Sequence, residues 1–324
     1  MHAARARIAE HVVATPMVRL RSGTVPAGRG DVARGIGDVP VPSQHLGRDL
    51  LLKLESLQVS GSFKARGAMN KVLSIAPEIA RRGLVTASGG NHGLAVAYAG
   101  RVVDVPTTVY LPRLTAPAKA ARIEGWGAHV VREGEVWDDA HAAGVAHATR
   151  DGLTYVHPFA DTAVVCGQAT IALEVLEQAP EVDLLVVAIG GGGLIAGVAA
   201  AAKLLRPDVR VIGVEPEGAP TLSESVRANA VIELAEIRTK AGTLAPRRSD
   251  ALNLAIIRET VDSIVLVSDD EMRAAARFLL TEVGIGAELS GAAALAAVLS
   301  NKADLGPAKN PCVLVCGAGS DALP

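Results

Sequence analysis

The stretch from Leu184 to Ala202 contains no charged residue, and four consecutive glycines, Gly190, Gly191, Gly192 and Gly193, lie in its middle. A continuous apolar helix of this length would be long enough to cross a membrane. Four adjacent glycines disfavour that helix, because each glycine costs about 1 kcal/mol relative to alanine in a helix interior. We therefore predict a buried strand over 184–189, a glycine loop, and a helix over 194–205.

From residue 50 onward, apolar strand-like runs alternate with segments of helical periodicity. The predicted strands are 50–54, 84–87, 107–111, 129–131, 154–156, 184–189, 209–214, 264–267 and 312–315. The predicted helices include 65–73, 117–124, 136–150, 163–178, 194–205, 270–283 and 291–300. This alternation favours an α/β fold with parallel sheets covered by helices on both faces. Ligands of such sheets bind beyond the carboxyl ends of the strands.

The amino-terminal part lacks this alternation. Residues 1–20 are predicted to form a short helix followed by an extended segment at Thr15-Pro16. Residues 22–42 are rich in glycine and proline and have no apolar period, so we expect a mobile loop without an assigned function.

Composition excludes several classes of protein. Hydrophobic residues make up 49% and charged residues 20% of the chain, which is typical of a globular protein. A net charge of −2 and an aromatic content of 2% give no reason to expect a nucleic acid or membrane partner. Three cysteines suit a reducing compartment, and charged residues near the amino terminus argue against a signal peptide. We therefore expect a cytoplasmic protein.

Lys64 stands between the aromatic Phe63 and small residues, just after a predicted strand and at a predicted helix start. The free N–H groups of a helix start disfavour a second positive charge. A lysine amine with a lowered pKa is a nucleophile that forms a Schiff base with carbonyl compounds. A surface lysine on an ordinary helix is the alternative for this residue taken alone.

Two glycine-rich loops follow other predicted strands. The loop from Ser88 to Gly93 would expose backbone N–H groups to a carboxylate, with Asn91 as a further donor, although Ser and Asn are also common helix caps. His92 in this loop is a general base or, as we favour, a histidine bonded to the backbone. The tetraglycine loop suits a phosphate, and its rival interpretations are a packing turn or a dinucleotide site with Glu215 on the ribose. A dinucleotide site explains neither Lys64 nor the Asn91 loop.

Together these motifs resemble the pyridoxal-phosphate enzymes of fold type II, and within them the serine/threonine dehydratases. The resemblance extends over nearly the whole chain. It is carried by Thr15-Pro16-Met17, Lys53-Leu54-Glu55, the Lys64 stretch, the Asn91 loop, the tetraglycine, Gly213-Val214-Glu215-Pro216, Glu288-Leu289-Ser290-Gly291-Ala292 and Val315-Cys316-Gly317. It implies two open parallel-sheet domains with helices on both faces, a large one of residues 1–78 and 158–324 and a small one of 79–157. It also implies a homodimer.

The resemblance assigns a role to each candidate residue. Lys64 would bind pyridoxal 5'-phosphate covalently and remove the substrate Cα proton. The remaining cofactor contacts would be Phe63 beside the ring, Asn91 on the ring hydroxyl, Cys316 against the pyridine nitrogen, and Gly190, Gly191, Gly192, Gly193 and Leu194 on the phosphate. The substrate carboxylate would lie at Ser88, Asn91 and His92, with Gln168 and Glu288 as further candidates. A neutral thiol at Cys316 would make the ring a weaker electron sink and favour loss of a β-leaving group.

Two departures from the family pattern bear on function. Relatives that racemise serine carry a serine where this chain has Gly89, so we expect inefficient racemisation. Metal-activated relatives use a Glu, a carbonyl and an Asp, where this chain has Glu215, Ala219 and Thr221, so we assign no metal and keep Glu215 and Ala219 as weak candidates. The expected function is an L-threonine/L-serine dehydratase that forms a 2-keto acid and ammonia. The alternatives are a racemase or lyase acting on another hydroxy amino acid, and a nicotinamide-dependent oxidoreductase.

Overall fold

The computed structural model describes residues 1–22, 36–41 and 48–319. The chain divides into two compact units. The smaller unit consists of Met1–Val13 and Lys64–Gln168, and the larger unit consists of Ala14–Phe63 and Ala169–Pro324. Each unit has its own sheet and its own buried core.

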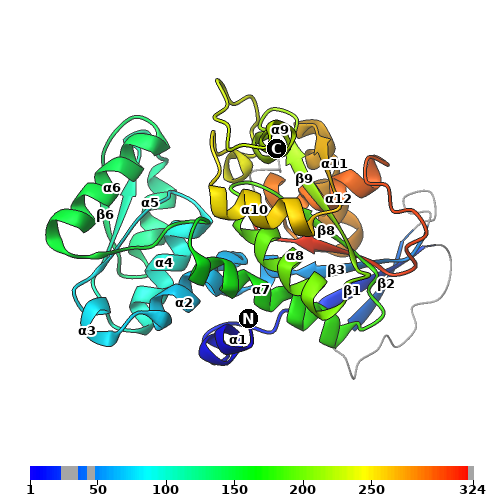
Figure 1. Ribbon diagram of the computed structural model, residues 1–324, viewed down its shortest axis with the longest axis horizontal. Coiled ribbons are helices and arrows are strands. Elements are labelled where there is room, and N and C mark those ends of the chain that lie inside the picture. Colours follow the sequence, from blue (N-terminus) through cyan, green and yellow to red (C-terminus); the bar gives the residue numbers. More distant parts are fainter. Residues whose placement is uncertain (23–35, 42–47, 320–324) are drawn as a thin grey trace. The chain divides into compact units, whose positions relative to one another are not determined.

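A seven-stranded sheet forms the centre of the larger unit (Figure 1). Its strands, in spatial order, are β10 (Ser263–Val267), β9 (Arg210–Pro216), β8 (Leu184–Ala188), β11 (Pro311–Val315), β3 (Leu50–Leu54), β1 (Met17–Ser22) and β2 (Ile36–Val41). Every neighbouring pair is parallel except β1 and β3, which are antiparallel. Every residue of β3, β8 and β11 is buried, as expected for central strands covered on both faces.

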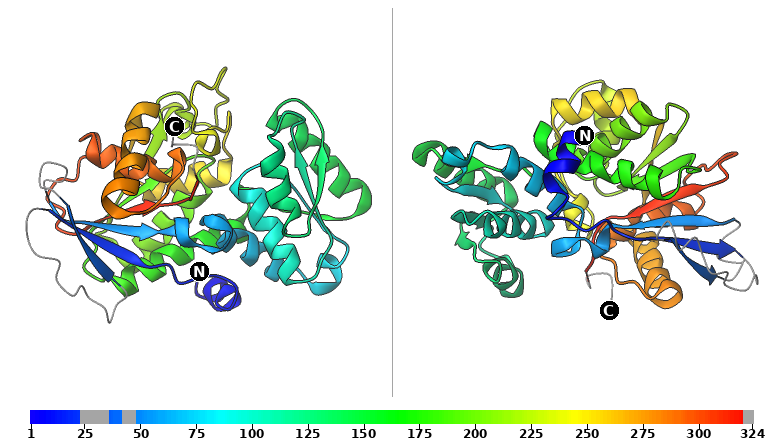
Figure 2. Two further views of the ribbon diagram at one scale, coloured as in Figure 1. Left: turned by 180° about the vertical axis from the view of Figure 1, so that it is seen from behind. Right: turned by 90° about the horizontal axis from the view of Figure 1, so that it is seen from below.

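Helices cover both faces of this sheet. In Figure 2, right, α8 (Gly193–Leu205) and α10 (Ala251–Thr260) lie on one side, and α11 (Asp269–Phe278) and α12 (Leu289–Leu299) lie on the other. Helix α9 (Thr221–Ala228) follows β9, α7 (Thr162–Gln178) precedes β8, and a single π-helical turn, Leu279–Val283, continues α11. Short 3₁₀ turns span Glu55–Leu57, Val59–Gly61 and Gly242–Leu244.

A four-stranded parallel sheet forms the smaller unit, in the order β6 (His129–Arg132), β5 (Thr107–Leu111), β4 (Leu84–Ala87) and β7 (Thr154–Tyr155). Helix α6 (Trp137–Asp151) packs against one face through Ala140 and Ala148. Helices α4 (Asn91–Val102), α5 (Pro117–Glu124) and α2 (Lys64–Ser74) make up the other layer. Two short helices, α1 (His2–Ile8) and α3 (Pro77–Ala80), complete the unit.

The predicted α/β architecture with two sheets is confirmed, and the uncharged run is β8, a glycine loop and α8. Over the described parts of the chain, no helix combines the length and apolarity that a bilayer crossing requires. The larger sheet is mixed and not purely parallel, since β1 runs against β3. Within the expected mobile loop, residues 36–41 are instead the edge strand β2, where Pro40 is tolerated because an edge strand leaves one side unpaired. Ser22, the first residue of that predicted loop, is the last residue of β1, and residues 23–35 and 42 lie outside the described residues.

The bounds of the smaller unit differ from the predicted domain limits of 79 and 157. Helix α2 lies with the four-stranded sheet because Met69 and Val72 share a buried cluster with Ala95 and Val96 of α4. Amino-terminal residues join the same cluster through Ile8. The division into functional domains stays a prediction.

Candidate active site

Lys64 is the first residue of α2, so the predicted helix start is confirmed. A tight turn with positive φ at Ser60 and Gly61 precedes it. The Lys64 Nζ donates a hydrogen bond of 2.7 Å to the backbone oxygen of Pro158. The side chain therefore turns toward the segment that follows β7.

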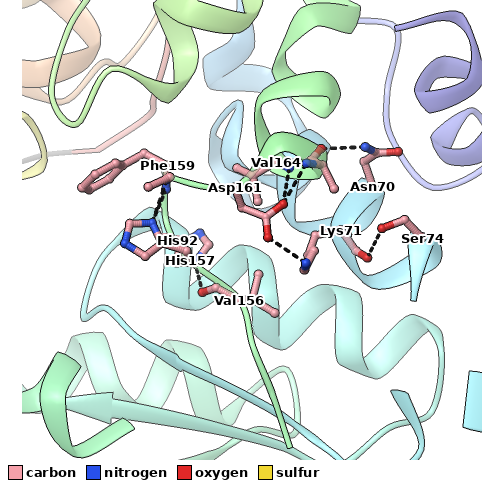
Figure 3. A network of polar contacts seen from close by, with 11 residues as sticks. Asn70, Lys71, Ser74, His92, Val156, His157, Phe159, Asp161 and Val164 are labelled. Carbon is pink, nitrogen blue, oxygen red and sulfur yellow. Dashed lines mark hydrogen bonds and ion pairs between the residues drawn. The ribbon is translucent and has the colours of Figure 1, made fainter. Parts of the chain in front are cut away.

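Side chains of the smaller unit bond to the backbone on both sides of Pro158, and those of His92 and His157 are drawn in Figure 3. The carbonyl of Val156 accepts from Thr86 Oγ1 at 2.8 Å and lies 3.0 Å from His92 Nε2. His157 Nδ1 accepts from the backbone N–H groups of Phe159 and Ala160. Because these bonds fall on either side of Pro158, its carbonyl has a fixed direction.

The start of α7 continues this fixed segment. Asp161 accepts from the backbone N–H groups of Ala163 and Val164, which makes it the amino-terminal cap of α7, and it also pairs with Lys71 at 2.7 Å (Figure 3). Asn70 donates to the Ala163 carbonyl at 2.6 Å. Helix α2, which begins at Lys64, is thereby tied to the segment that its first residue contacts.

The loop from Ser88 to Gly93 opens α4, with Asn91 as its first helical residue. Ser88 Oγ accepts from the Gly90 N–H at 3.2 Å. A Cβ on Gly93 would collide with the Ser88 carbonyl oxygen, so this position admits only glycine without a backbone shift. Gly89 has more room, since a Cβ there would lie 3.0 Å from Cγ2 of Thr115.

His92 is buried, and its Nε2 bonds to the Val156 carbonyl, so the preferred prediction of a backbone-bonded histidine is confirmed. A carbonyl only accepts, so Nε2 carries the proton and Nδ1 has a lone pair. Burial, followed by the charge of Lys64, lowers the pKa of His92 to about 3. The Nδ1 atom is buried and has no hydrogen-bond partner in the described part of the chain. His92 is thus a neutral imidazole at physiological pH.

In the larger unit, the tetraglycine follows β8 and opens α8, as predicted. Gly192 has a φ of +88° and no room for a side chain, because a Cβ would lie 2.7 Å from Cδ1 of Leu222. Helix α8 begins at Gly193, and the Ala196 N–H donates to the carbonyl of Gly192 before it. The N–H groups of Gly193 and Leu194 therefore have no acceptor within the helix, and they favour an anion at this end.

Cys316 follows β11 and is buried. Its backbone oxygen accepts from the Phe63 N–H at 3.2 Å, and its Sγ lies 3.5 Å from the Ser290 carbonyl. The Ser290 hydroxyl is buried and, among the described residues, has no hydrogen-bond partner. Cys316, Phe63 and Ser290 thus form one cluster in the larger unit. Lys64 directly follows Phe63 in the chain.

Comparison with known proteins assigns the chain to a family. A family model described as pyridoxal-phosphate dependent enzyme matches residues 32–317. The chain belongs to this family. The match covers most of the sequence, and the predicted resemblance to fold type II enzymes is confirmed. Pyridoxal phosphate is accordingly the cofactor of this enzyme.

Individual relatives span several activities. An L-threonine ammonia-lyase of Thermotoga maritima is 38% identical over 281 residues, which cover 87% of this chain and 70% of that protein. A phenylserine dehydratase of Ralstonia pickettii is 38% identical over 287 residues, which cover 87% and 85%. The structure of maize serine racemase superimposes with a TM-score of 0.87 at 30% identity and covers 98% of this chain and 93% of that one.

The residues present fit this cofactor. The open N–H groups at the start of α8 suit a phosphate, and the loop that presents them needs glycine, because a Cβ at Gly190 or Gly192 would collide with Thr243 or Leu222. The unpartnered Ser290 hydroxyl and the Cys316 thiol are neutral groups suited to an uncharged pyridine nitrogen. When bound, the cofactor supplies an electron sink for the bonds of the substrate α-carbon.

In this pyridoxal-phosphate dependent enzyme, Glu288 belongs to the larger unit and Gln168 to the smaller unit. Glu288 is the residue before α12, and its Oε1 lies 3.4 Å from Oγ1 of Thr243, whose backbone oxygen packs against Gly190. Gln168 is buried on α7 against Gly67 of α2, and neither of its amide atoms has a hydrogen-bond partner within the described ranges. Sequence reasoning did not find Thr243, Ser290 or Pro158 as parts of these clusters.

Glu215, one of the weak metal candidates, and Thr221 bond to the backbone around the start of α9. Both carboxylate oxygens of Glu215 accept backbone N–H groups, from Leu222 and Ser223, at 2.8 Å each. The Thr221 hydroxyl donates to the Pro246 carbonyl. Burial raises the pKa of Glu215 to about 8, although the two N–H donors oppose this shift. Glu215 therefore caps α9 in this structure.

Proposed function

We propose that this enzyme is an L-threonine/L-serine ammonia-lyase, which removes water and then ammonia from a β-hydroxy amino acid to give a 2-keto acid. The observation that carries the proposal is Gly89, which leaves the substrate loop without an acid or base where racemising relatives have serine. An active site in which one lysine transfers the proton favours elimination over the return of a proton to the opposite face of the substrate α-carbon. The similarity to the Thermotoga maritima ammonia-lyase supports the same reading.

Lys64 is proposed to carry the cofactor and to move the Cα proton. A lysine amine that is released during turnover is a base, and a carbonyl acceptor stabilises its protonated form. The Pro158 carbonyl lies within 2.7 Å of the Lys64 Nζ and supplies that acceptor. We propose that Pro158 thereby keeps the amine in one place while it holds the proton.

Neutral groups are proposed for the pyridine nitrogen. The Cys316 thiol and the Ser290 hydroxyl cannot hold a proton on that nitrogen as a carboxylate would. With these neutral residues at the nitrogen, the bound cofactor would be a weaker electron sink, which suits elimination of a β-leaving group. The N–H groups of the Asn91 loop are proposed for the substrate carboxylate, since a helix start favours an anion.

The first experiment is the visible spectrum of the purified protein before and after L-threonine, with borohydride trapping and peptide mapping. We expect a yellow protein labelled at Lys64 whose spectrum changes as keto acid forms. Lys64→Ala should remain folded and lose turnover. A yellow protein whose spectrum does not change with threonine or serine would refute the proposed substrates. Keto-acid formation by Lys64→Ala would refute the role of the lysine.

The second candidate is a racemase, because maize serine racemase shares the fold over most of both chains. Chiral analysis of unreacted L-serine separates the two activities. Accumulation of D-serine faster than pyruvate would favour the racemase. A panel that includes aryl β-hydroxy amino acids covers the substrate of the Ralstonia pickettii relative.

We also propose a cytoplasmic homodimer, on the strength of the family resemblance and of a content of only three cysteines, which suits a reducing compartment. Light scattering of the eluted protein would give the oligomeric mass, and a monomer at working concentration would refute the dimer.

A further inference from the structure

The carbonyl oxygen of Gly191, inside the tetraglycine loop, accepts two side-chain hydrogen bonds. Asn253 Nδ2 donates at 2.8 Å and Ser249 Oγ donates at 3.0 Å. Asn253 lies on α10 and is fully buried, and Ser249 lies just before that helix and is 7% exposed. All three residues belong to the larger unit. Two buried donors on one loop carbonyl give that peptide a defined orientation.

The orientation of this peptide decides where its N–H group points. In a trans peptide the carbonyl and the N–H of the next residue point in opposite directions, and the described residues contain no cis bond. Because Ser249 and Asn253 hold the Gly191 carbonyl, the Gly192 N–H points away from both. A flipped peptide would break both bonds and turn a carbonyl oxygen toward the side where the amide now points.

Packing reinforces the same arrangement. A Cβ at Gly192 would lie 3.1 Å from Cβ of Asn253 and 3.1 Å from Cδ1 of Ile257, another residue of α10. The loop and α10 are therefore in close contact, and the positive φ of Gly192 is a conformation that only glycine adopts readily. Asn253 both packs against the loop and bonds to it.

We propose that Asn253 and Ser249 are positioning residues for the cofactor phosphate, acting through the Gly191 carbonyl to aim the Gly192 N–H at the phosphate. This inference rests on the proposed assignment of the tetraglycine loop to that group. The two residues stand 62 and 58 positions after Gly191, so no local motif connects them with the loop. An anion beside a correctly aimed N–H is stabilised, and an anion beside a flipped carbonyl is repelled.

The test compares two ligands of the cofactor-free, full-length protein. Pyridoxal phosphate and pyridoxal share the ring and the aldehyde, and only the first carries the phosphate. The dissociation constant of pyridoxal divided by that of pyridoxal phosphate measures the contribution of the phosphate site to binding. We expect Asn253→Leu to reduce this ratio by about tenfold or more, and Ser249→Ala to reduce it less, with pyridoxal binding unchanged.

Ser225→Ala is the matched control. Ser225 is also a buried serine of the larger unit that donates to a backbone carbonyl, that of Thr221, and it should leave the ratio unchanged. Ser249→Ala keeps the test informative if Asn253→Leu does not fold. The ³¹P chemical shift of bound pyridoxal phosphate provides a second readout, and we expect it to move in the Asn253 and Ser249 variants but not in the control.

The outcomes separate two failures. If the unmodified protein binds both ligands equally, the assignment of the phosphate to the tetraglycine loop is wrong. If it prefers pyridoxal phosphate and both variants retain the full preference, the positioning role is wrong while the loop assignment stands. Equal weakening of both ligands would also overturn the positioning role, because it indicates a general loss of structure.

Discussion

The imidazole of His92 and the carbonyl of Val156 lie 3.0 Å apart, which ties the start of α4 to the segment after β7. The same segment carries Pro158, whose carbonyl accepts from the Lys64 amine. The proposed substrate loop and the proposed catalytic lysine are thereby anchored to one stretch of backbone within the smaller unit.

His92→Asn should make stability less sensitive to acid. Folding lowers the pKa of His92 from its ordinary 6.5 to about 3, mainly through burial. Between these two pKa values His92 is protonated in the unfolded chain and neutral in the folded protein. The stabilisation present above pH 6.5 is therefore lost as the pH falls toward 3. Asparagine keeps an N–H donor and does not titrate.

Urea unfolding at about pH 7 and about pH 5 measures this effect. The free energy of unfolding should fall less between these pH values in His92→Asn than in the unmodified protein. His2→Asn, at an exposed position, is the control and should behave like the unmodified protein. An unchanged pH dependence in His92→Asn would contradict the buried neutral state.

Glu215→Gln should reduce the loss of folding stability that accompanies a rise in pH. Burial raises the pKa of this carboxyl from 4.5 to about 8, so the folded protein holds a proton that the unfolded chain has lost. Stability therefore decreases as the pH rises between these two values, by up to about 1.4 kcal/mol per pH unit. Glutamine has no proton to lose, and the decrease should be smaller in the variant.

The matched control for this prediction is Glu217→Gln, two residues further along the chain and exposed. Thermal or urea unfolding across the pH range from about 5 to about 8 gives the slopes. If Glu215→Gln and Glu217→Gln show the same slope as the unmodified protein, the buried carboxyl is ionised throughout and the expectation is wrong.

Gly89→Ser should raise the ratio of racemisation to elimination. A Cβ at this position would lie 3.0 Å from Cγ2 of Thr115, a side-chain atom that can move, and Gly89 does not have a positive φ. The new hydroxyl supplies the group that the loop lacks. Chiral chromatography of L-serine reactions, with Gly89→Ala as the control for size, would measure the ratio. Equal ratios in both variants would show that the hydroxyl has no part in proton return.

Glu174→Ala should destabilise the larger unit by about 3–5 kcal/mol, the usual cost of leaving a buried charge unpaired. Lys53 is fully buried on β3, and its Nζ bonds to Glu174 Oε2 at 2.8 Å, to the Thr15 carbonyl at 2.7 Å and to Gln178. Glu181→Ala, whose side chain pairs at a more exposed site with Arg19, is expected to cost about 1 kcal/mol or less. Similar unfolding midpoints for the two variants would contradict this ranking.

Local pattern was sufficient for much of the fold. The strands at 50–54, 84–87 and 107–111 have the predicted limits, because short apolar runs bounded by turn residues carry their own signal. The strand β2 was missed, because a short edge strand that contains glycine and proline has no apolar period, and the extended segment predicted at Thr15-Pro16 did not include the limits of β1. The larger sheet is mixed because β1 runs antiparallel to β3.

The sequence by itself determined the alternating α/β pattern, the helix start at Lys64 and the glycine turn that opens α8, because each depends on the conformational preferences of neighbouring residues. Only the tertiary structure decided which distant groups act on those motifs. The bonds from Ser249 and Asn253 to Gly191 and from Lys64 to Pro158 join residues that stand 58, 62 and 94 positions apart in the sequence. Hydrogen bonds of this kind depend on where folding brings each donor and acceptor, and no local preference encodes that position.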